Sequence, residues 1–355
     1  MNKASQASPS LCLVVPCFNE EEMLPTFLQT VIPQLETATI GHWQIVCVDD
    51  GSQDGTLDVI AAAHADEPRV TGIKLSRNFG HQAAVSVGLA FASGDYIGVM
   101  DCDLQDPIEV LIHLYDRAVR DGLDVCYGIR ARRQAPLLLK LGYWFFYRLI
   151  DRVADYHWPK DAGDFSVISS KCHAILLALP ERSRMVRGLR AWVGLKQAGI
   201  PYDRPQRARG SSKYNLWKLC SLALHGLIAF SNIPLRLASI IGLIMGAGSI
   251  LVGILAAVNR LFPHVTVLGY WVGANPGITT LLCFLALVFS VLFVSLGIIG
   301  EYLVVLLQEV KRRPTAIVDN VVGALHKNTS AEHVIHVIDP SGTTPIFRDC
   351  AGLSE

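Results

Sequence analysis

The sequence lacks an excess of charge of either sign, because 31 lysines and arginines balance 31 aspartates and glutamates over its 355 residues. No global field therefore attracts a polyanion, and we expect no nucleic-acid partner. Charged residues make up only 17% of the chain, whereas hydrophobic residues make up 51% and the mean hydropathy is +0.36. This composition is too apolar for a soluble enzyme and indicates an integral membrane protein.

Two common phosphate-binding signatures are also missing. The chain contains neither G-x-G-x-x-G, which marks dinucleotide-binding folds, nor G-x-x-x-x-G-K-[ST], whose backbone cradles phosphates. If a nucleotide binds, its phosphates must be bound through a metal ion and carboxylates rather than by a glycine-rich loop.

The cysteine spacing gives no sign of disulfide or metal-site pairing, and the N-terminus gives no sign of a signal peptide. Nine cysteines are spread irregularly without a C-x-x-C pair, so we expect them to be small apolar core residues in a reducing compartment. Residues 1–10 are polar and are expected to be flexible, and the apolar run at 11–15 is too short for the core of a signal peptide. We therefore predict no cleaved leader.

Long apolar runs are concentrated in the C-terminal third. Residues 237–258 and 265–300 contain no charged side chain, and each run exceeds the ~20 residues that a helix needs to cross the hydrocarbon core. We predict two transmembrane helices, at 235–259 and 278–307. The alternative is a pair of buried core helices, for which these runs are unusually long.

Positive charge predicts the orientation of the two helices. Arg236 lies at the start of the first span, and Lys311, Arg312 and Arg313 follow the second. Because positive flanks stay inside, residues 260–277 form an external loop, while the N-terminal domain and the tail at 308–355 face the cytoplasm. We expect a multi-pass protein of the inner (cytoplasmic) membrane with room for a homo-oligomer, which the sequence does not decide.

The region before the spans alternates short apolar runs with helical patterns. This alternation predicts an α/β domain with a mostly parallel sheet that is covered on both sides. The strand-and-turn segments are LCLVVPCFNE (11–20), WQIVCVDDGSQDGT (43–56), VTGIKLSRN (70–78), DYIGVMDCD (95–103) and LDVCYGIR (123–130), which closes the series. Helices are expected at 21–35, after 56, at 82–92, and from Pro107 to about Arg120.

Each expected strand ends in polar residues. Ligands of parallel sheets bind beyond the carboxyl ends of the strands, so these ends should converge on one cleft. They comprise Asn19, Glu20, Asp49, Asp50, Ser76, Arg77, Asn78, Asp101, Asp103 and Arg130.

Asp101 and Asp103 are candidate metal ligands. Alternate residues of a continuing strand point to opposite faces, so both carboxylates can reach one ligand only if the chain turns there. Mg²⁺ normally takes one or two carboxylates together with substrate phosphates. A short acidic turn without a ligand is the alternative, but the position at the end of the fourth strand favours a metal site.

The segment VDDGSQDGT (48–56) contains a second pair of acids. Gly51 and Gly55 permit a tight turn and Asp54 can cap the following helix, which is a purely structural explanation. It does not account for Asp49 and Asp50 directly after an apolar strand. A carboxylate there is suited to accept a hydrogen bond from a nucleobase or a ribose hydroxyl.

Two segments between the α/β region and the spans have interfacial character. Residues 136–153 and 215–230 mix aromatics, leucines and cations, as helices lying on a membrane do, with amphipathic core helices as the alternative. We assign 11–214 to the N-terminal domain and 215–234 to a juxtamembrane helix. Residues 182–218 hold ten lysines and arginines and one acid, Asp203. Their place before a span favours contact with lipid phosphate over a solvated basic face.

Seven motifs taken together carry a family resemblance. They are VVPCFNEEE, VDDGSQDGT, LSRNFGHQAA, DCDLQDP, DAGDFSVIS, LPERSRMVRGLRAWVG and RARGSSKYN, in this order, followed by the apolar runs and KRRP. Over residues 11–314 the chain resembles the polyprenyl-phosphate glycosyltransferases of glycosyltransferase family two. The resemblance implies a GT-A type nucleotide-binding domain, a UDP-sugar donor, Mg²⁺ or Mn²⁺, and polyprenyl (undecaprenyl) phosphate as acceptor in the lipid bilayer.

The resemblance also implies a donor site. Pro16, Asn19 and Glu20 look like the first nucleotide-binding loop, and Asp50 looks like the acid that reads uracil. Asp101 and Asp103 resemble the D-x-D pair of the family, with Asp103 and Gln105 nearest the metal.

On the acceptor side, the resemblance implies a set of phosphate contacts. Arg130 and Arg132 would contact the sugar or the lipid phosphate. Asp164 of DAGDF matches an acid near the acceptor, with Asp161 a poorer candidate. A loop that grips phosphates would contribute Arg187, Arg209, Ser211 and Lys213.

These roles lead to an expected reaction. A lipid monophosphate is already anionic at pH 7, so its attack on the anomeric carbon needs a strong general base less than a sugar hydroxyl does. We expect one in-line displacement with inversion and release of UDP. Asp164 would act as a base or orient an arginine or a sugar hydroxyl. Glucose is the first choice of sugar, and N-acetylglucosamine, galactose, mannose and an aminoarabinose-type sugar stay open.

Two other functions remain as alternatives. A processive polysaccharide synthase shares this domain type but carries a Q-x-x-R-W motif and more spans, and residues 190–192 do not form that motif. A non-catalytic membrane scaffold with a nucleotide fold would be favoured by loss of the D-x-D pair or the basic loop, and both are present. The external segment at 265–277 and the tail after Pro314 look longer than in a close relative, and the tail carries no readable motif.

Overall fold

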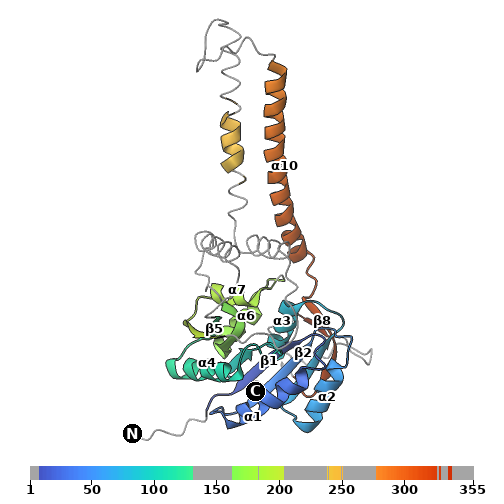
Figure 1. Cartoon of the computed structure of the whole chain (residues 1–355), viewed down its shortest axis with the longest axis vertical. Helices are drawn as coiled ribbons and strands as arrows, with labels where there is room; N and C mark the ends of the chain where they lie inside the picture. Colours follow the sequence, from blue (N-terminus) through green and yellow to red (C-terminus); the bar gives the residue numbers. More distant parts are fainter. Residues whose placement is uncertain are drawn as a thin grey trace, which may run out of the picture. The chain divides into compact units, whose positions relative to one another are not determined.

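One mixed sheet organises most of the N-terminal domain in the computed structural model (Figure 1). The structure describes residues 8–130, 162–182, 184–203, 240–248, 277–325 and 335–337, together with residues 238, 250 and 328. Within these residues nine strands form a sheet in the order β7-β5-β6-β4-β1-β2-β3-β8-β9. The strands are β1 (Leu11–Cys17), β2 (Trp43–Asp49), β3 (Val70–Leu75), β4 (Tyr96–Val99), β5 (Val125–Arg130), β6 (Ala162–Ser169), β7 (Gln197–Tyr202), β8 (Ala316–Val322) and β9 (Ile335–Val337).

The centre of the sheet is parallel, as predicted. Strands β4, β1, β2 and β3 run in the same direction, and β5 runs parallel to β7. Strand β6 is antiparallel to both β4 and β5, and β8 is antiparallel to β3. All five predicted strands are present, but the series does not close at β5, because β6 lies between β4 and β5 and four strands follow β5 along the chain.

Helices cover both faces of the sheet, so the prediction of an α/β domain with a mostly parallel, doubly covered sheet is confirmed. The helices of this domain are α1 (Leu24–Thr37), α2 (Thr56–Asp66), α3 (His81–Phe91), α4 (Ile108–Asp121), α6 (Ser170–Ala178) and α7 (Val186–Trp192). One apolar core joins the sheet to α3, α6 and α7, and a second joins it to α1, α2 and α4.

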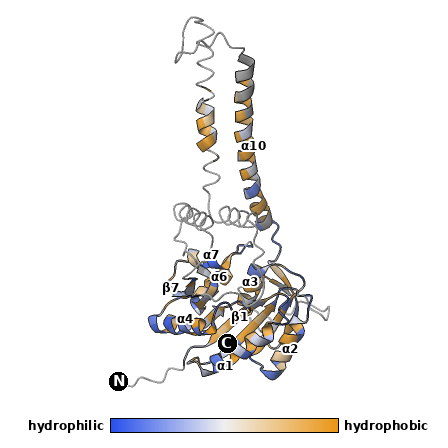
Figure 2. Ribbon diagram, in the orientation of Figure 1, coloured by the Kyte–Doolittle hydropathy of each residue, from blue (hydrophilic) through white to orange (hydrophobic). Residues whose placement is uncertain are grey.

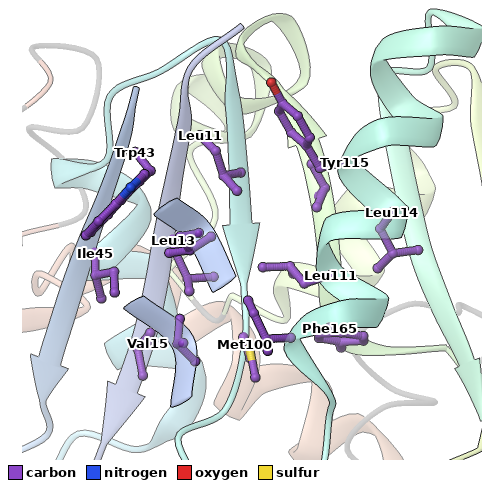
Figure 3. Close-up of a cluster of buried hydrophobic side chains, with 14 of the residues drawn as sticks. Leu11, Leu13, Val15, Trp43, Ile45, Met100, Leu111, Leu114, Tyr115 and Phe165 are labelled. Carbon is purple, nitrogen blue, oxygen red and sulfur yellow. The ribbon is translucent and has the colours of Figure 1, made fainter. Parts of the chain in front are cut away.

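Alternation along β1 explains how one strand serves both cores. Cys12 and Val14 face the first core, whereas Leu11, Leu13 and Val15 face the second, as the period of two in a strand requires. Figure 3 shows the second core, where side chains of β1 and β2 lie beside those of α4. Full burial of each leucine or valine contributes roughly 1.5–3 kcal/mol.

Local signals place most of the helix boundaries. Pro107 directly precedes α4, and Gly122 ends it in the left-handed conformation with φ +58°, which a residue without Cβ adopts readily. Helix α1 begins at Leu24 rather than at the predicted residue 21. The predicted apolar cysteines are confirmed where they are described, since Cys12, Cys17, Cys47, Cys102, Cys126 and Cys172 are free and buried.

The tail after the second apolar run contributes strands that the sequence analysis missed. Strand β8 pairs with β3, and Ser76 N donates to Ile317 O at 3.0 Å. Arg182 Nη1 donates to Arg313 O at 3.0 Å, and Thr315 Oγ1 donates to Arg182 O at 3.5 Å. The described tail residues 311–325 and 335–337 accordingly belong to the same compact unit as the N-terminal sheet.

Helix α10 (Gly277–Val310) belongs to a second unit and is apolar along most of its length (Figure 2). Its segment Leu287–Leu307 has 21 residues, a mean hydropathy of 2.2 and 0% burial, which makes it long and apolar enough to cross a membrane. It lies in the predicted span 278–307. Among the described residues it is the one such helix, so two spans are not confirmed.

Several predicted segments lie largely outside the described residues. Residues 240–248 are helical and fall within the predicted first span at 235–259. The rest of that span, the external loop at 260–276, and the interfacial segments at 136–153 and 215–230 are not described by the structure, except for residues 238 and 250.

Candidate active site

A pocket of about 290 Å³ lies at the carboxyl ends of the central parallel strands. The chain enters it after each of β1, β2, β3 and β4, which are adjacent in the sheet. The lining residues are Pro16, Cys17, Phe18, Glu20, Asp50, Asn78, Gly80, His81, Asp101, Cys102 and Asp103. The expected convergence of polar strand ends therefore occurs for these four strands.

Asp101 and Asp103 both line this pocket because the chain turns after β4. Leu104 adopts a left-handed φ of 54°, and Asp103 Oδ1 accepts a hydrogen bond of 3.1 Å from Gln105 N. Burial raises the pKa of Asp101, and nearby His81 opposes this rise. Gln105 is buried and is not among the described lining residues, so its part in metal binding stays a prediction.

Asp50 joins the pocket to the loop after β3. Asp50 as a whole is 3% exposed, and its carboxylate accepts hydrogen bonds from Phe79 N at 2.7 Å and Gly80 N at 2.9 Å. Burial raises the pKa of Asp50, while these two amides oppose the rise. Gly51 allows the close approach of the two loops, since a Cβ there would lie 2.4 Å from the carbonyl carbon of Arg77.

The end of β1 and the loop after it contain both lining and supporting residues. Pro16 of β1 and Glu20 of the loop line the pocket. Asn19, which has a positive φ of 54°, instead links two loops: its N donates to Ser52 Oγ at 2.8 Å and its Oδ1 accepts from Gln53 N at 3.0 Å. Asp49 is likewise supporting, because its Oδ1 accepts from Ser52 N at 2.9 Å.

His81 occupies the centre of the acidic site and was not singled out from the sequence. It is the first residue of α3, and its Nε2 lies 3.7 Å from Asp101 Oδ1 and 3.5 Å from Asp164 Oδ2. Burial by itself lowers the pKa of His81, but the Asp164 and Asp101 carboxylates outweigh it and raise this pKa above its ordinary value. The signal that marked it was its place in LSRNFGHQAA, just after the polar end of the third strand.

Asp164 lies on β6 and is held by several groups. Gln82 Nε2 donates to Asp164 Oδ2 at 2.8 Å, while Val186 N at the start of α7 donates to Gln82 Oε1 at 2.8 Å. Burial favours a higher pKa for Asp164, but contact with His81 and the charge of Arg187 lower it overall. Arg187 of α7 is thus electrostatically coupled to this carboxylate, although it is not among the described lining residues.

A buried arginine supports the β6 segment from behind. Arg190 is 1% exposed and donates through Nη2 to Gly163 O at 3.0 Å and through Nη1 to Ser166 Oγ. Burial lowers the pKa of Arg190, and the negative charge of Asp164 opposes this effect. Arg190 therefore holds the Gly163 carbonyl and the Ser166 hydroxyl, one on each side of Asp164 along the chain.

Arg130, at the end of β5, lies beside a buried acid and a tyrosine. Its Nη2 lies 4.0 Å from Asp106 Oδ2, and Tyr202 donates a hydrogen bond to Asp106 Oδ1. The structure thus groups Arg130 with Asp106 and Tyr202, and contact with a phosphate stays a prediction. Asp161, Arg132, Arg209, Ser211 and Lys213 lie outside the described residues.

The donor set of the pocket fits a divalent metal ion. Asp101 and Asp103 offer hard oxygen ligands in one pocket, and burial makes the charge of Asp101 costly in the absence of a cation. The described residues contain no group of three or more histidines, cysteines or acids that would hold an ion alone. Mg²⁺ normally takes one or two carboxylates together with substrate phosphates, and Asp101 and Asp103 supply two carboxylates.

Comparison with known proteins gives matches over most of the chain. The model of the family described as glycosyl transferase family 2 matches residues 12–174. An uncharacterized glycosyltransferase of Synechocystis is 35% identical over 314 residues, which cover 88% of this chain and 96% of the relative. A bactoprenol glucosyl transferase of Shigella phage SfII is 36% identical over 310 residues, which cover 87% of this chain and 97% of the phage protein.

Solved structures are more distant. A mannosyltransferase of Pyrobaculum calidifontis is 14% identical, with a TM-score of 0.43 and coverage of 85% of this chain and 87% of that chain. A similarity at this level carries no argument about the site.

Proposed function

Since the chain belongs to glycosyltransferase family 2 and is a polyprenyl-phosphate glycosyltransferase, we propose that it transfers glucose from UDP-glucose to undecaprenyl phosphate with inversion. The glucose and the lipid are supported by relatives named bactoprenol glucosyl transferases. The observation that carries the proposal is the convergence of Asp50, Asp101 and Asp103 on one pocket.

In this proposal the two ends of the donor would bind at different sides of the pocket. Asp50 and the loop after β1 form the side where the uracil and ribose would bind, because a carboxylate accepts hydrogen bonds from base and hydroxyl donors. Asp101 and Asp103 form the side of the diphosphate. Magnesium or manganese bound there would neutralise negative charge on the departing UDP.

The acceptor requires positive charge opposite these acids. Arg187 lies on α7, and its charge helps to lower the pKa of Asp164 and opposes the rise of the pKa of His81. We propose that Arg187, together with Arg130, Arg132, Arg209, Ser211 and Lys213, binds the lipid phosphate and brings two anionic substrates together.

The reaction is a single displacement. An oxygen of the lipid phosphate forms a bond to the anomeric carbon as the bond between that carbon and the UDP oxygen breaks, and UDP leaves with the electron pair. The attacking oxygen carries no proton that must be removed at neutral pH, so the site needs orientation and charge balance more than a base. The product is a polyprenyl-phosphate-linked sugar suited to modification of cell-envelope glycans.

The membrane arrangement is part of the proposal. Helix α10 would span the inner membrane, preceded by a second span at 235–259. The basic residues 311–313 after α10 favour a cytoplasmic position for the tail and for the sheet that it joins. The sugar would thus be transferred at the cytoplasmic face, where a nucleotide sugar is available.

Purified full-length protein, incubated with separate UDP-sugars, polyprenyl phosphate and Mg²⁺ or Mn²⁺, tests the proposal. Mass spectrometry of the lipid fraction should detect one added hexose with UDP-glucose, and NMR should detect inverted anomeric configuration. Polymer formation without the lipid would favour a processive synthase. Absence of UDP release with every donor would favour a non-catalytic scaffold.

A further inference from the structure

We infer that His81 is the residue that contacts the bound donor beside Asp101, and that Asp164 acts through His81 as a positioning residue rather than on a substrate itself. This inference deepens the proposed function and rests on it. It concerns His81 at the start of α3 and Asp164 on β6, whose side chains lie next to each other.

His81 and Asp164 differ in how much of their side chains is exposed to solvent. The His81 side chain is 45% exposed and lines the pocket, whereas the Asp164 side chain is 14% exposed and is not among the described lining residues. A ligand held by Asp101 and Asp103 therefore meets the imidazole first. Asp164 lies behind the imidazole, where it contacts His81 Nε2 at 3.5 Å.

His81 Nε2 lies at similar distances from two carboxylates. Nε2 lies 3.7 Å from Asp101 and 3.5 Å from Asp164, and both separations exceed the length of a normal N–H···O hydrogen bond. The imidazole is thus held between two carboxylates without a short bond to either. The Nε2–H of the ring would donate a hydrogen bond to an oxygen of the donor, either of the diphosphate or of a sugar hydroxyl.

The partners of Asp164 are those of a residue that orients its neighbours. Its Oδ2 accepts a hydrogen bond of 2.8 Å from Gln82, the residue after His81, and its backbone is fixed by Arg190. Asp164 therefore ties β6 to the first turn of α3, where His81 begins the helix. Replacing Asp164 removes the carboxylate that lies beside the imidazole.

Three variants test whether Asp164 acts through His81. They are His81→Ala, Asp164→Asn and the double variant, each assayed for transfer to polyprenyl phosphate. Misplacement of the reacting groups by about 1 Å costs about 100-fold in rate, so we expect His81→Ala to lower kcat by about that factor and Asp164→Asn by no more. The double variant should equal His81→Ala. Asp164→Asn should leave KM for the lipid phosphate unchanged within about twofold.

Three results would overturn the inference. They are a double variant clearly slower than His81→Ala, a larger loss for Asp164→Asn than for His81→Ala, and a raised KM for the lipid phosphate in Asp164→Asn. The matched control is His113→Ala on the exposed side of α4, which should keep wild-type kinetics. Thermal unfolding of each variant identifies loss of folding.

A readout without turnover separates this inference from the proposed function. Diethylpyrocarbonate modifies accessible histidines, and peptide mass spectrometry follows His81 and His113 individually. Saturating UDP-glucose with Mn²⁺ should protect His81 at least fivefold and leave His113 unchanged. Protection of His81 no greater than that of His113 contradicts the inference, whereas absence of transfer by the wild-type protein contradicts the proposed function.

Discussion

Gln82 and Asp164 are joined by a hydrogen bond of 2.8 Å from the Gln82 amide to Asp164 Oδ2. The two residues are 82 positions apart in the chain, and Gln82 Oε1 accepts from Val186 N at the start of α7. One carboxamide thus connects α3, β6 and α7. The arrangement links the acid behind His81 to the helix that carries Arg187.

The first prediction concerns this carboxamide. Gln82→Glu replaces the donor by a carboxylate directly beside Asp164, and a hydrogen bond to a charged group contributes about 1.5–3 kcal/mol. We expect kcat for lipid-dependent transfer to fall about 10- to 100-fold, with a smaller change in KM for the UDP-sugar. Wild-type kcat in a folded Gln82→Glu protein would show that this link has no role in the reaction.

The second prediction concerns the loop contact of Asp50. Asp50→Asn retains one acceptor oxygen and loses the other, so either Phe79 N or Gly80 N loses its partner. Since an unsatisfied buried group costs about 1–3 kcal/mol, UDP affinity should fall at least fivefold. Calorimetric titration with UDP measures this, and an unchanged Kd would remove Asp50 from the nucleotide site.

The third prediction concerns the buried Arg190. Lysine cannot reproduce the forked donation of Arg190 to Gly163 O and Ser166 Oγ. Arg190→Lys should therefore destabilise the domain by about 2–3 kcal/mol, seen as a lower Tm in detergent. The control Arg120→Lys, at a side chain that is 69% exposed, should leave Tm unchanged. Equal Tm values for both variants would contradict the structural role of Arg190.

The fourth prediction concerns the strand after α10. Val318 of β8 is fully buried in the first core, whereas neighbouring Asp319 is exposed. Val318→Asp buries a charge and detaches β8, which leaves β3 as an open sheet edge that favours aggregation. Size-exclusion chromatography should detect aggregates for Val318→Asp and not for Asp319→Asn. A monodisperse, active Val318→Asp protein would contradict a structural role of the tail.

The sequence predicted the elements whose signals are local. Asp50, Asp101 and Asp103 each follow an apolar strand directly, and strands of a parallel sheet place such ends together. That reasoning correctly brought them to one pocket. The five strands β1 to β5 were also predicted correctly, because each is an apolar run bounded by turn residues.

The missed features depend on contacts between distant segments. Strand β6 lies between β4 and β5 although it follows both in the chain, and no period within 162–169 indicates that neighbour. Strand β8 pairs with β3, although both long apolar runs lie between these two strands in the sequence. His81 resembles any polar residue at a helix start until Asp101 and Asp164 are placed beside it. Asn19 and Asp49 make loop hydrogen bonds that the sequence did not indicate, and a contact of Asn19 with the donor stays a prediction.

The central claim is that Asp101 and Asp103 hold a divalent ion against the diphosphate of the donor. Calorimetric titration of UDP into metal-free protein, with and without added Mn²⁺, tests it most directly when wild type and Asp103→Ala are compared. The account predicts that Mn²⁺ strengthens UDP binding at least tenfold in the wild type and has no such effect in Asp103→Ala. Equal UDP affinity with and without Mn²⁺ in the wild type, or an undiminished Mn²⁺ effect in a folded Asp103→Ala protein, would contradict it.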